Sequence, residues 1–465
     1  MVQIFGHYVS KSFAMLGIIE TLLLQAMLVA GVWLRFSEFN PAGEVPIGPL
    51  WPKAIVYSAV VILCMVSMGL YHRDVQAGFV GILLRIILAL GLAFLVISAL
   101  FYAYPPLFIG RGVLAYTLGA SLLALTISRL LFFHYGSRYA PQRRILVLGT
   151  GKNAQKITDL RNGNPHCGFT IVGFVHVRGE HDEVPQNRII ATDNSLLGTV
   201  KTEQIEEIVV TVRNRRDGLP IEDLLEAKLC GVRVTDFLSF FERETGRIDL
   251  GSLYPSWLIY ANGFEQHFLQ QRAKRAFDIG VSLTLLILAS PLMVGAVLAI
   301  WLESGLRGPI IYRQIRVGKD WNLIQVMKFR SMQVDAEKEG VAQWAQKNDA
   351  RVTRTGNIIR KFRIDELPQL FNVLRGEMSF VGPRPERPEF VEQLAKTIPF
   401  YNERLRVKPG ITGWAQVRYQ YAATEQDSYN KLEYDLYYVK NFGIFLDFLI
   451  LLYTAEVVLW RKGAV

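Results

Sequence analysis

Hydrophobic residues gather in the first third of the chain, in four long runs separated by short polar segments. The runs cover residues 13–34, 55–70, 79–102 and 113–133. A helix that crosses a bilayer needs about 20 mainly apolar residues. The first, third and fourth runs reach this length, and the second does if it includes Tyr71. The pattern therefore predicts four transmembrane helices within residues 1–138.

Charged residues near these runs bear on their orientation. Lys11 precedes the first run, and Arg143 and Arg144 follow the fourth. With an even number of spans, the positive-inside tendency places both ends of this region in the cytoplasm. Glu20 and Arg85 fall inside predicted spans, where a charge is a candidate functional residue. We favour a structural reading, either a pair between helices or an arginine that reaches toward a helix end.

The pattern changes near residue 141 to short β-branched runs that alternate with helical periods. Strands are predicted at 144–148, 170–177, 207–212 and 232–237, and a helix at 220–228. This alternation is typical of a parallel sheet covered by helices, so residues 139–255 are predicted to form a Rossmann-like α/β module.

Gly149, Gly151 and Ala154 follow the first of these strands in the spacing GxGxxA, a variant of the dinucleotide-binding fingerprint. Such a site also needs an acid close after the second strand. Here the first acid, Glu180, comes late. Nucleotide binding and a structural or regulatory role both stay open, and the second is favoured.

A linker is predicted at 256–273, and a third domain at 274–465. The domain opens with an apolar run at 279–302 that contains Ser290 and Pro291 near its middle. Proline removes a helix hydrogen bond, and Ser290 can satisfy the freed carbonyl. The run is either a kinked span or a re-entrant helix. Basic residues on both sides favour the re-entrant form: Lys274, Arg275, Arg313 and Arg316.

The last apolar run, at 442–460, contains Asp447 and Glu456. These acids favour a helix that lies on the membrane surface over one that crosses it. The overall composition is 51% hydrophobic and 20% charged, which excludes a disordered chain. Three isolated cysteines predict no disulfide framework and no zinc site. The net charge of +10 fits anionic lipid and phosphate better than nucleic acid, because the basic residues border apolar runs or an acidic pair.

That acidic pair is Asp365-Glu366, directly before a helical period at 367–374. Pro368 suits a first helical turn and Gly376 a helix end. A carboxylate at a helix N-terminus stays ionised, ready to act as a nucleophile or metal ligand. Ordinary helix capping is the simpler alternative. A β-hairpin is also predicted, with strands at 310–314 and 323–329.

Two stiff loops that carry arginines follow the acidic pair. One is Gly382-Pro-Arg384-Pro385, and the other is 408–414, which precedes Arg418. Rigid loops with arginines suit phosphate binding. The candidate phosphate contacts are Arg384, Arg360, Arg418 and Lys328.

From about residue 274 to the end, the chain resembles the monotopic phosphoglycosyl transferases, bacterial sugar transferases that load undecaprenyl phosphate. The matching motifs occur in the expected order. They are Ser290-Pro291, Lys328-Phe-Arg-Ser-Met332, Asp365-Glu-Leu-Pro-Gln369, Gly382-Pro-Arg-Pro385 and Pro409-Gly-Ile-Thr-Gly413. Four spans plus an α/β module resemble the long members of this family, so the resemblance covers nearly the whole chain.

The resemblance implies transfer of a sugar 1-phosphate from a UDP-sugar to undecaprenyl phosphate, with release of UMP. Asp365 would be the nucleophile and would form an aspartyl-phosphosugar. Asp365 and Glu366 would hold Mg²⁺. It also implies a location in the bacterial inner membrane with the site on the cytoplasmic face, a role in starting exopolysaccharide, O-antigen or capsule assembly, and a possible homodimer.

The chain departs from many relatives after Trp414, which puts the role of Arg418 and the sugar preference in doubt. Two rival functions remain. A nucleotide-sugar epimerase or dehydratase needs a Tyr-x-x-x-Lys pair, and the α/β module offers none: at the lysine position, Tyr139 has Arg143 and Tyr254 has Leu258. A non-catalytic component of polysaccharide export would leave Asp365-Glu366 and the arginine loops without a purpose.

Overall fold

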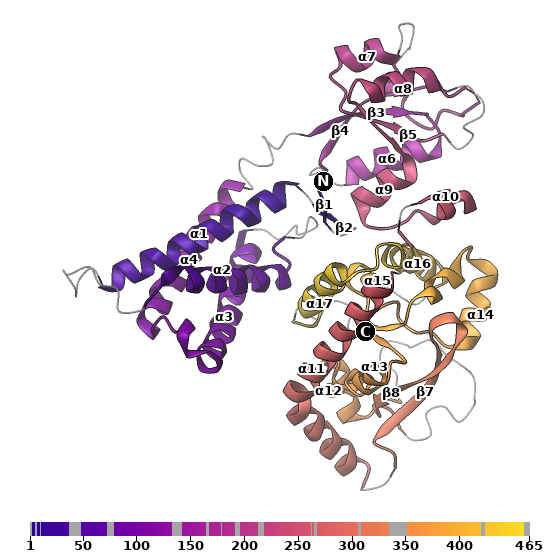
Figure 1. Cartoon of the computed structure of the whole chain (residues 1–465). Helices are drawn as coiled ribbons and strands as arrows, with labels where there is room; N and C mark the ends of the chain where they lie inside the picture. Colours follow the sequence, from indigo (N-terminus) through magenta and orange to yellow (C-terminus); the bar gives the residue numbers. More distant parts are fainter. Residues whose placement is uncertain are drawn as a thin grey trace. The chain divides into compact units, whose positions relative to one another are not determined.

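The fold is that of a computed structural model, which divides into two compact units between Tyr254 and Pro255 (Figure 1). It describes residues 2–4, 7–9, 11–36, 48–71, 79–132, 142–163, 167–177, 179–190, 196–212, 218–261, 263–264, 267–305, 308–333, 351–419 and 424–459. The described residues combine several long apolar helices with a parallel sheet. The chain is therefore a membrane protein with an α/β part.

Four apolar helices precede the sheet: α1 (Lys11–Phe36), α2 (Leu50–Ser67), α3 (Phe79–Ala103) and α4 (Arg111–Leu131). Each is long and apolar enough to cross a membrane, which confirms the predicted apolar helices. Phe133, the predicted end of the fourth, lies outside the described residues. The four helices share a buried core that includes Leu28, Met65, Ile86 and Leu125.

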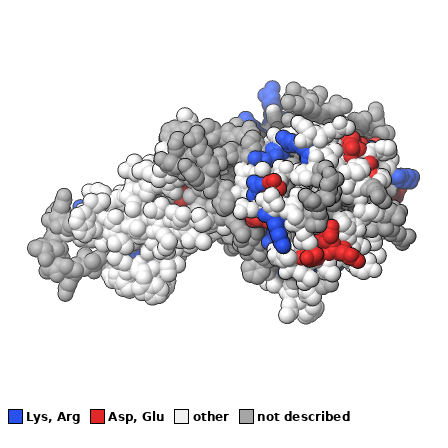
Figure 2. Space-filling view, turned by 90° about the horizontal axis from the view of Figure 1, so that it is seen from above, with Lys and Arg blue, Asp and Glu red and all other residues white. Residues whose placement is uncertain are grey.

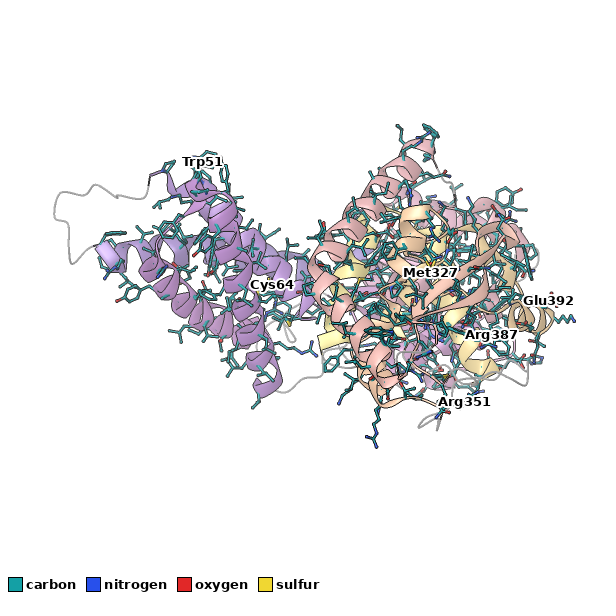
Figure 3. The ribbon with its side chains drawn as sticks, turned by 90° about the horizontal axis from the view of Figure 1, so that it is seen from below. Trp51, Cys64, Met327, Arg351, Arg387 and Glu392 are labelled. Atoms are coloured by element: carbon teal, nitrogen blue, oxygen red, sulfur yellow. The ribbon has the colours of Figure 1, made fainter. Side chains whose placement is uncertain are left out.

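The outer surface of these helices is apolar, as membrane helices require. In Figure 2 their described surface shows almost no charged side chains. Trp51, at the start of α2, projects outward and is 71% exposed, whereas Cys64 lies among the helices (Figure 3). Exposed aromatic rings at helix ends are typical of the membrane–water interface.

Glu20 is paired between helices, as the structural reading predicted, and Arg85 is hydrogen-bonded to a backbone carbonyl. Glu20 of α1 is fully buried and accepts hydrogen bonds from Nε and Nη2 of Arg129 on α4, at 2.7 and 2.9 Å. The Tyr71 hydroxyl also donates to Glu20. Arg85 donates to the Met68 carbonyl at 2.5 Å. A buried charge is tolerated when it is paired and hydrogen-bonded, so these residues need no functional explanation.

The α/β module has a four-stranded, all-parallel sheet of order β4-β3-β5-β6. Its strands are β3 (Arg143–Leu148), β4 (Phe169–Val175), β5 (Glu207–Val210) and β6 (Arg233–Asp236). Helices α7 (Leu196–Thr202) and α8 (Ile221–Leu229) lie on one side of the sheet, and α6 (Lys152–Gly163) and α9 (Phe237–Thr245) on the other (Figure 1). The predicted parallel sheet is confirmed.

The glycine-rich loop between β3 and α6 is filled by the chain itself. Oε2 of Glu180 accepts the backbone N–H groups of Thr150 at 2.8 Å and Gly151 at 3.3 Å. The backbone N–H of Glu183 donates to the Thr150 carbonyl at 2.8 Å. Gly149 has a φ of +120°, and a Cβ there would lie 2.8 Å from the Glu180 carboxylate. The late acid therefore binds where the fingerprint would hold a phosphate.

In the second unit, α10 (Pro255–Tyr260) and the first turn of α11 (Phe268–Glu303) occupy most of the predicted linker. Helix α11 continues through Pro291. The carbonyl that Pro291 leaves without a helix donor is that of Ile287, four residues earlier. The Ser290 hydroxyl donates to it at 2.8 Å, as the sequence predicts.

The remainder of the second unit is built from short elements. Its strands are β7 (Ile311–Val317), β8 (Leu323–Phe329), β9 (Ser379–Val381) and β10 (Gly410–Thr412). Its helices are α12 (Arg354–Lys361), α13 (Gln369–Arg375), α14 (Pro388–Thr397), α15 (Trp414–Arg418), α16 (Glu425–Lys440) and α17 (Ile444–Leu459). β7 and β8 form the predicted antiparallel hairpin. Trp460, the predicted end of the last helix, lies outside the described residues.

Some charges that pointed to the membrane surface are instead internal. Lys274 is 6% exposed and its Nζ lies 2.6 Å from Oδ2 of Asp447, which is fully buried. The Tyr438 hydroxyl donates to Oδ1 of Asp447 at 2.7 Å. Arg275 donates to the carbonyls of Val373 and Leu374. Asp447 thus joins α17 to α11 and α16, and it does not mark an exposed helix face.

Candidate active site

The acidic pair lies in a 3-10 turn, Ile364–Glu366, directly before α13. Arg363 introduces this turn with a left-handed backbone, at φ +57°. Pro368 is the residue that precedes α13, and Gly376 ends the helix with φ +85°. The predicted stop at Gly376 is confirmed. The pair, however, occupies its own turn and not the first turn of the helix, because Pro368 occupies the cap position.

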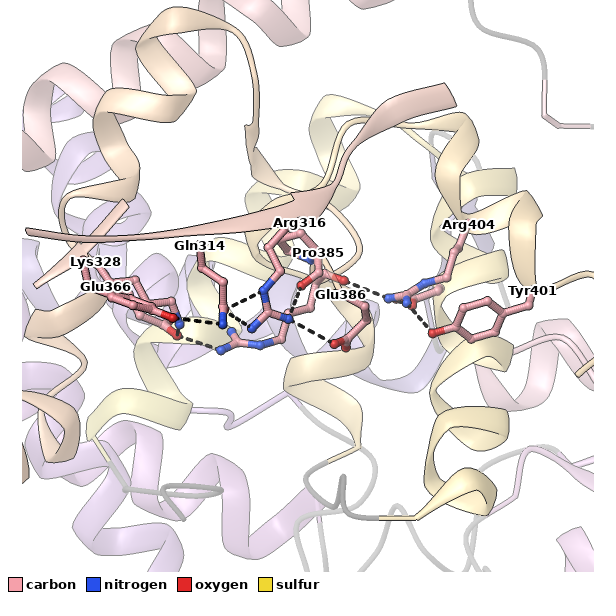
Figure 4. A network of polar contacts seen from close by, with 11 residues as sticks. Gln314, Arg316, Lys328, Glu366, Pro385, Glu386, Tyr401 and Arg404 are labelled. Atoms are coloured by element: carbon pink, nitrogen blue, oxygen red, sulfur yellow. Dashed lines mark hydrogen bonds and ion pairs between the residues drawn. The ribbon is translucent and has the colours of Figure 1, made fainter. Parts of the chain in front are cut away.

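Glu366 is the centre of a cluster of cations from separate elements (Figure 4). Its Oε1 lies 2.8 Å from Nη2 of Arg384, 3.3 Å from Nζ of Lys328 and 3.7 Å from Nη1 of Arg363. Burial alone would raise the pKa of Glu366, but these three cations outweigh burial and hold the pKa well below its usual range. Glu366 is therefore a fixed negative charge.

Asp365 has a different environment from its neighbour. It is 8% exposed, and its Oδ1 is buried without a hydrogen-bond partner among the described residues. Burial first, and the charge of Glu366 second, raise the pKa of Asp365 to about 6. A poorly solvated carboxylate with a free oxygen is more reactive than one held by donors. The two adjacent acids therefore have opposite pKa shifts and are suited to different roles in catalysis.

We expect activity to fall on the acid side of pH 6. If Asp365 must be ionised in the free enzyme, kcat/KM for the donor substrate falls roughly tenfold per pH unit below its pKa of about 6. Above pH 7 this group should impose no further dependence. Initial rates between pH 4.5 and 8 test this expectation. A limb centred near the ordinary aspartate pKa would contradict it.

Of the other candidate residues, the structure brings some to the acidic pair and others not. Lys328 and Arg384 contact Glu366 directly. Arg360 is near enough for its charge to act on Asp365. Arg418 instead lies over the Trp414 ring, 5.1 Å from the centroid. The sequence did not single out Arg363, because it lies in a run of basic residues whose spacing does not distinguish it.

The acidic pair fits one Mg²⁺ only if substrate supplies the remaining ligands. No group of three or more His, Cys, Asp or Glu side chains that could hold a metal occurs in the described part of the chain. Mg²⁺ is commonly held by one or two carboxylates together with substrate phosphates. The unpartnered Oδ1 of Asp365 is a suitable ligand, whereas Oε1 of Glu366 already has three cationic partners.

Comparisons with known proteins identify the family. Residues 269–461 match the family model described as bacterial sugar transferase. An Aeromonas hydrophila protein, "UDP-N-acetylgalactosamine-undecaprenyl-phosphate N-acetylgalactosaminephosphotransferase", is 45% identical over 52% of this chain and 56% of its own length, so the match spans about half of that relative.

Two further relatives match more of the chain. Both are described as "UDP-glucose:undecaprenyl-phosphate glucose-1-phosphate transferase". The protein from Xanthomonas campestris pv. campestris is 28% identical over 98% of this chain and 94% of its own length. The protein from Escherichia coli (strain K12) is 33% identical over 67% of each chain. The chain belongs to the family of bacterial sugar transferases, the phosphoglycosyl transferases.

A second family model, described as CoA-binding domain, matches residues 66–226. The described residues do not fit a pyrophosphate in the glycine-rich loop. The amides of Thr150 and Gly151, which such a group would use, already donate to Glu180. A phosphate there would also meet the negative charge of that carboxylate.

We expect neither coenzyme A nor NAD⁺ at about 1 mM to change the thermal unfolding midpoint of the whole protein, because a ligand stabilises only the state it binds. Thermal scans with and without each nucleotide test this. A midpoint that rises steadily with nucleotide concentration would contradict it, because stabilisation by a bound ligand grows with the logarithm of its concentration.

Proposed function

We propose that the chain transfers a sugar 1-phosphate from a UDP-sugar to undecaprenyl phosphate and releases UMP. The observation that carries the proposal is the difference in environment between the two residues of the acidic pair. Asp365 is buried with an unpartnered oxygen, and Glu366 is surrounded by Arg384, Lys328 and Arg363. The candidate nucleophile is thus adjacent to the residue that gathers the cations, and transfer of a phosphoryl group uses both kinds of group.

In the proposed first step, an Asp365 oxygen attacks the phosphorus that carries the sugar. The bond from this phosphorus to the oxygen bridging the two phosphates breaks, and UMP leaves with that oxygen. In the second step, an oxygen of undecaprenyl phosphate attacks the same phosphorus and the Asp365 carboxylate leaves. The products are undecaprenyl-diphosphate-sugar and UMP. Arg384 and Lys328 would bind the diphosphate oxygens. Asp365 and the diphosphate would hold a Mg²⁺ ion, whose positive charge would stabilise the leaving phosphate.

We also propose that α11 is re-entrant and that the active site faces the cytoplasm at the inner membrane. Both ends of α11 bind the same folded unit. Near its start, Lys274 pairs with Asp447. At its end, Glu303 accepts the backbone N–H groups of Arg354 and Thr355 at 2.9 and 3.1 Å. A helix that crossed the bilayer would separate these contacts by about 30 Å of hydrocarbon.

Cysteine labelling should report this topology. In a Cys230→Ser background, we expect Gln271→Cys and Pro309→Cys to react with a membrane-impermeant maleimide from the same side of sealed vesicles. Leu288→Cys, near the predicted break, should not react. Labelling of the first two from opposite sides would mean that α11 crosses the membrane.

The test of the reaction measures UMP. Purified protein with Mg²⁺, undecaprenyl phosphate and a panel of UDP-sugars should release UMP with one or more donors. Without the lipid, release should stop at one equivalent per active site and leave the labelled sugar phosphate on the protein. Release only when lipid is present would contradict the covalent intermediate. No release with any donor would contradict the reaction. The active donor, with the glycan pathway it implies, follows from the same panel. A homodimer is a further proposal, tested by mass measurement in detergent.

A further inference from the structure

Arg404 is a buried arginine that the sequence analysis did not single out. It lies in the 3-10 segment Tyr401–Arg406 and is 6% exposed. Its Nη1 donates to the Tyr401 hydroxyl at 2.8 Å, and its Nη2 forms an ion pair with Oδ2 of Asp435 on α16 at 2.8 Å. The same Nη2 donates to the backbone carbonyl of Arg384 at 3.0 Å. One guanidinium thus joins three separate segments.

The loop that receives this bond is held along its whole length. Four successive carbonyls, of residues 383–386, each accept a hydrogen bond from a different residue. The donors are Gly410 N at 2.9 Å, Arg404 Nη2 at 3.0 Å, Arg316 Nη1 at 3.2 Å and Val317 N at 2.9 Å. Figure 4 shows the side chains of this network, with Lys328 and Glu366 at one end, Arg316 in the middle, and Arg404 and Tyr401 at the other end. Arg404 holds the carbonyl of the very residue whose side chain reaches Glu366.

We propose that Arg404 is a positioning residue for the transfer reaction. Through the carbonyl of Arg384 it fixes the backbone from which the Arg384 guanidinium reaches Glu366 and the donor diphosphate. Asp435 supplies the buried counter-charge that keeps Arg404 in place. This inference rests on the proposed function and adds to it a residue that contacts neither the acidic pair nor substrate.

Geometry explains why this position needs arginine. The planar guanidinium presents several N–H groups at fixed angles, and here they reach a hydroxyl, a carboxylate and a carbonyl together. A lysine ammonium is a single point of charge and would keep the Asp435 pair while losing the rest. Arg404→Lys therefore preserves the buried charge balance, and it separates the positioning of Arg384 from simple loss of folding.

A double-mutant cycle tests the proposal. We expect Arg404→Lys to lower kcat about tenfold or more, because small displacements of catalytic groups have effects of that order. Arg384→Lys should lower it further, and the double variant should be no slower than Arg384→Lys alone, because residues that act as a unit are not additive. Arg406→Lys is the matched control. This arginine is 66% exposed and forms an ion pair with Glu403 at the surface, so the rate of the control should match wild type.

Additive losses, or an Arg404→Lys rate within twofold of the control, would overturn the proposal. If Arg404→Lys does not fold, Tyr401→Phe replaces it in the cycle, since it removes one acceptor and keeps the ring; the same two outcomes decide. The cycle is also run on the thermal unfolding midpoint. If the effects of the two substitutions on the midpoint are coupled but wild type releases no UMP, the proposed function is overturned and the link between Arg404 and Arg384 stands. Additivity there would overturn the link.

Discussion

Asp365→Asn is expected to abolish turnover, with a loss of at least about a thousandfold, because removal of a nucleophile affects every later step. The amide has the shape of the carboxylate but cannot form the acyl phosphate. UMP release with and without undecaprenyl phosphate measures the effect. The single equivalent released without lipid should disappear as well.

The same variant should fold at least as stably as wild type. The pKa of Asp365 is about 6 in the folded protein, above its value of 3.8 in an unfolded chain. A raised carboxyl pKa means that ionisation disfavours the folded state, so at pH 7.5 the charged side chain destabilises it. Removing that charge should leave the thermal unfolding midpoint unchanged or raise it. Active sites often trade stability for function in this way.

Asp320→Asn is the matched control for this change. Asp320 is an exposed residue of the hairpin turn with a left-handed backbone, at φ +50°, which asparagine also adopts readily. Its activity should equal that of wild type. Normal UMP release by Asp365→Asn would show that another residue is the nucleophile. A folding defect in Asp365→Asn would contradict the reading of its pKa.

Local sequence signals predicted most of the elements around this site. The apolar runs, the alternation of strands and helices, the hairpin and the stop at Gly376 each depend on neighbouring residues, and each agrees with the structure. Ser290 and Ile287 are likewise three residues apart. Such features follow from helix and strand geometry, which acts over a few residues.

Contacts between residues far apart in the chain could not be predicted from the sequence. Asp447 looked like an exposed charge on an apolar helix, yet its partner Lys274 is 173 residues away in the chain. Arg404 and Arg406 look alike in the sequence, although Arg404 is buried and Arg406 is at the surface. Arg418 was chosen for its nearness to a glycine-rich motif, and it lies over Trp414. Only tertiary packing distinguishes these residues.

Glu366→Gln should have the second large effect, through the charge that it removes. Glu366 forms ion pairs with Arg384, Lys328 and Arg363. These cations therefore do not bind Asp365, whose Oδ1 has no hydrogen-bond partner among the described residues. In the variant, the three cations lose their carboxylate, while the charge of Asp365 still acts on Lys328 and Arg384. A nucleophile held by cations is less reactive, and a misplaced arginine no longer meets the diphosphate. We expect kcat to fall by about a hundredfold to a thousandfold, as when a single preorganised electrostatic contact is removed.

The pH profile separates this role from that of a proton donor or a metal ligand. The charge of Glu366 raises the pKa of Asp365, so its removal should lower that pKa, and the acid limb of kcat/KM should move below about pH 6. The sign follows because loss of a neighbouring negative charge makes ionisation of Asp365 easier. Residual activity followed with a radiolabelled donor gives the profile. If the acid limb stays near pH 6, burial alone sets the pKa of Asp365. If the limb moves to higher pH, Glu366 is not the charge that keeps the cations away from the nucleophile.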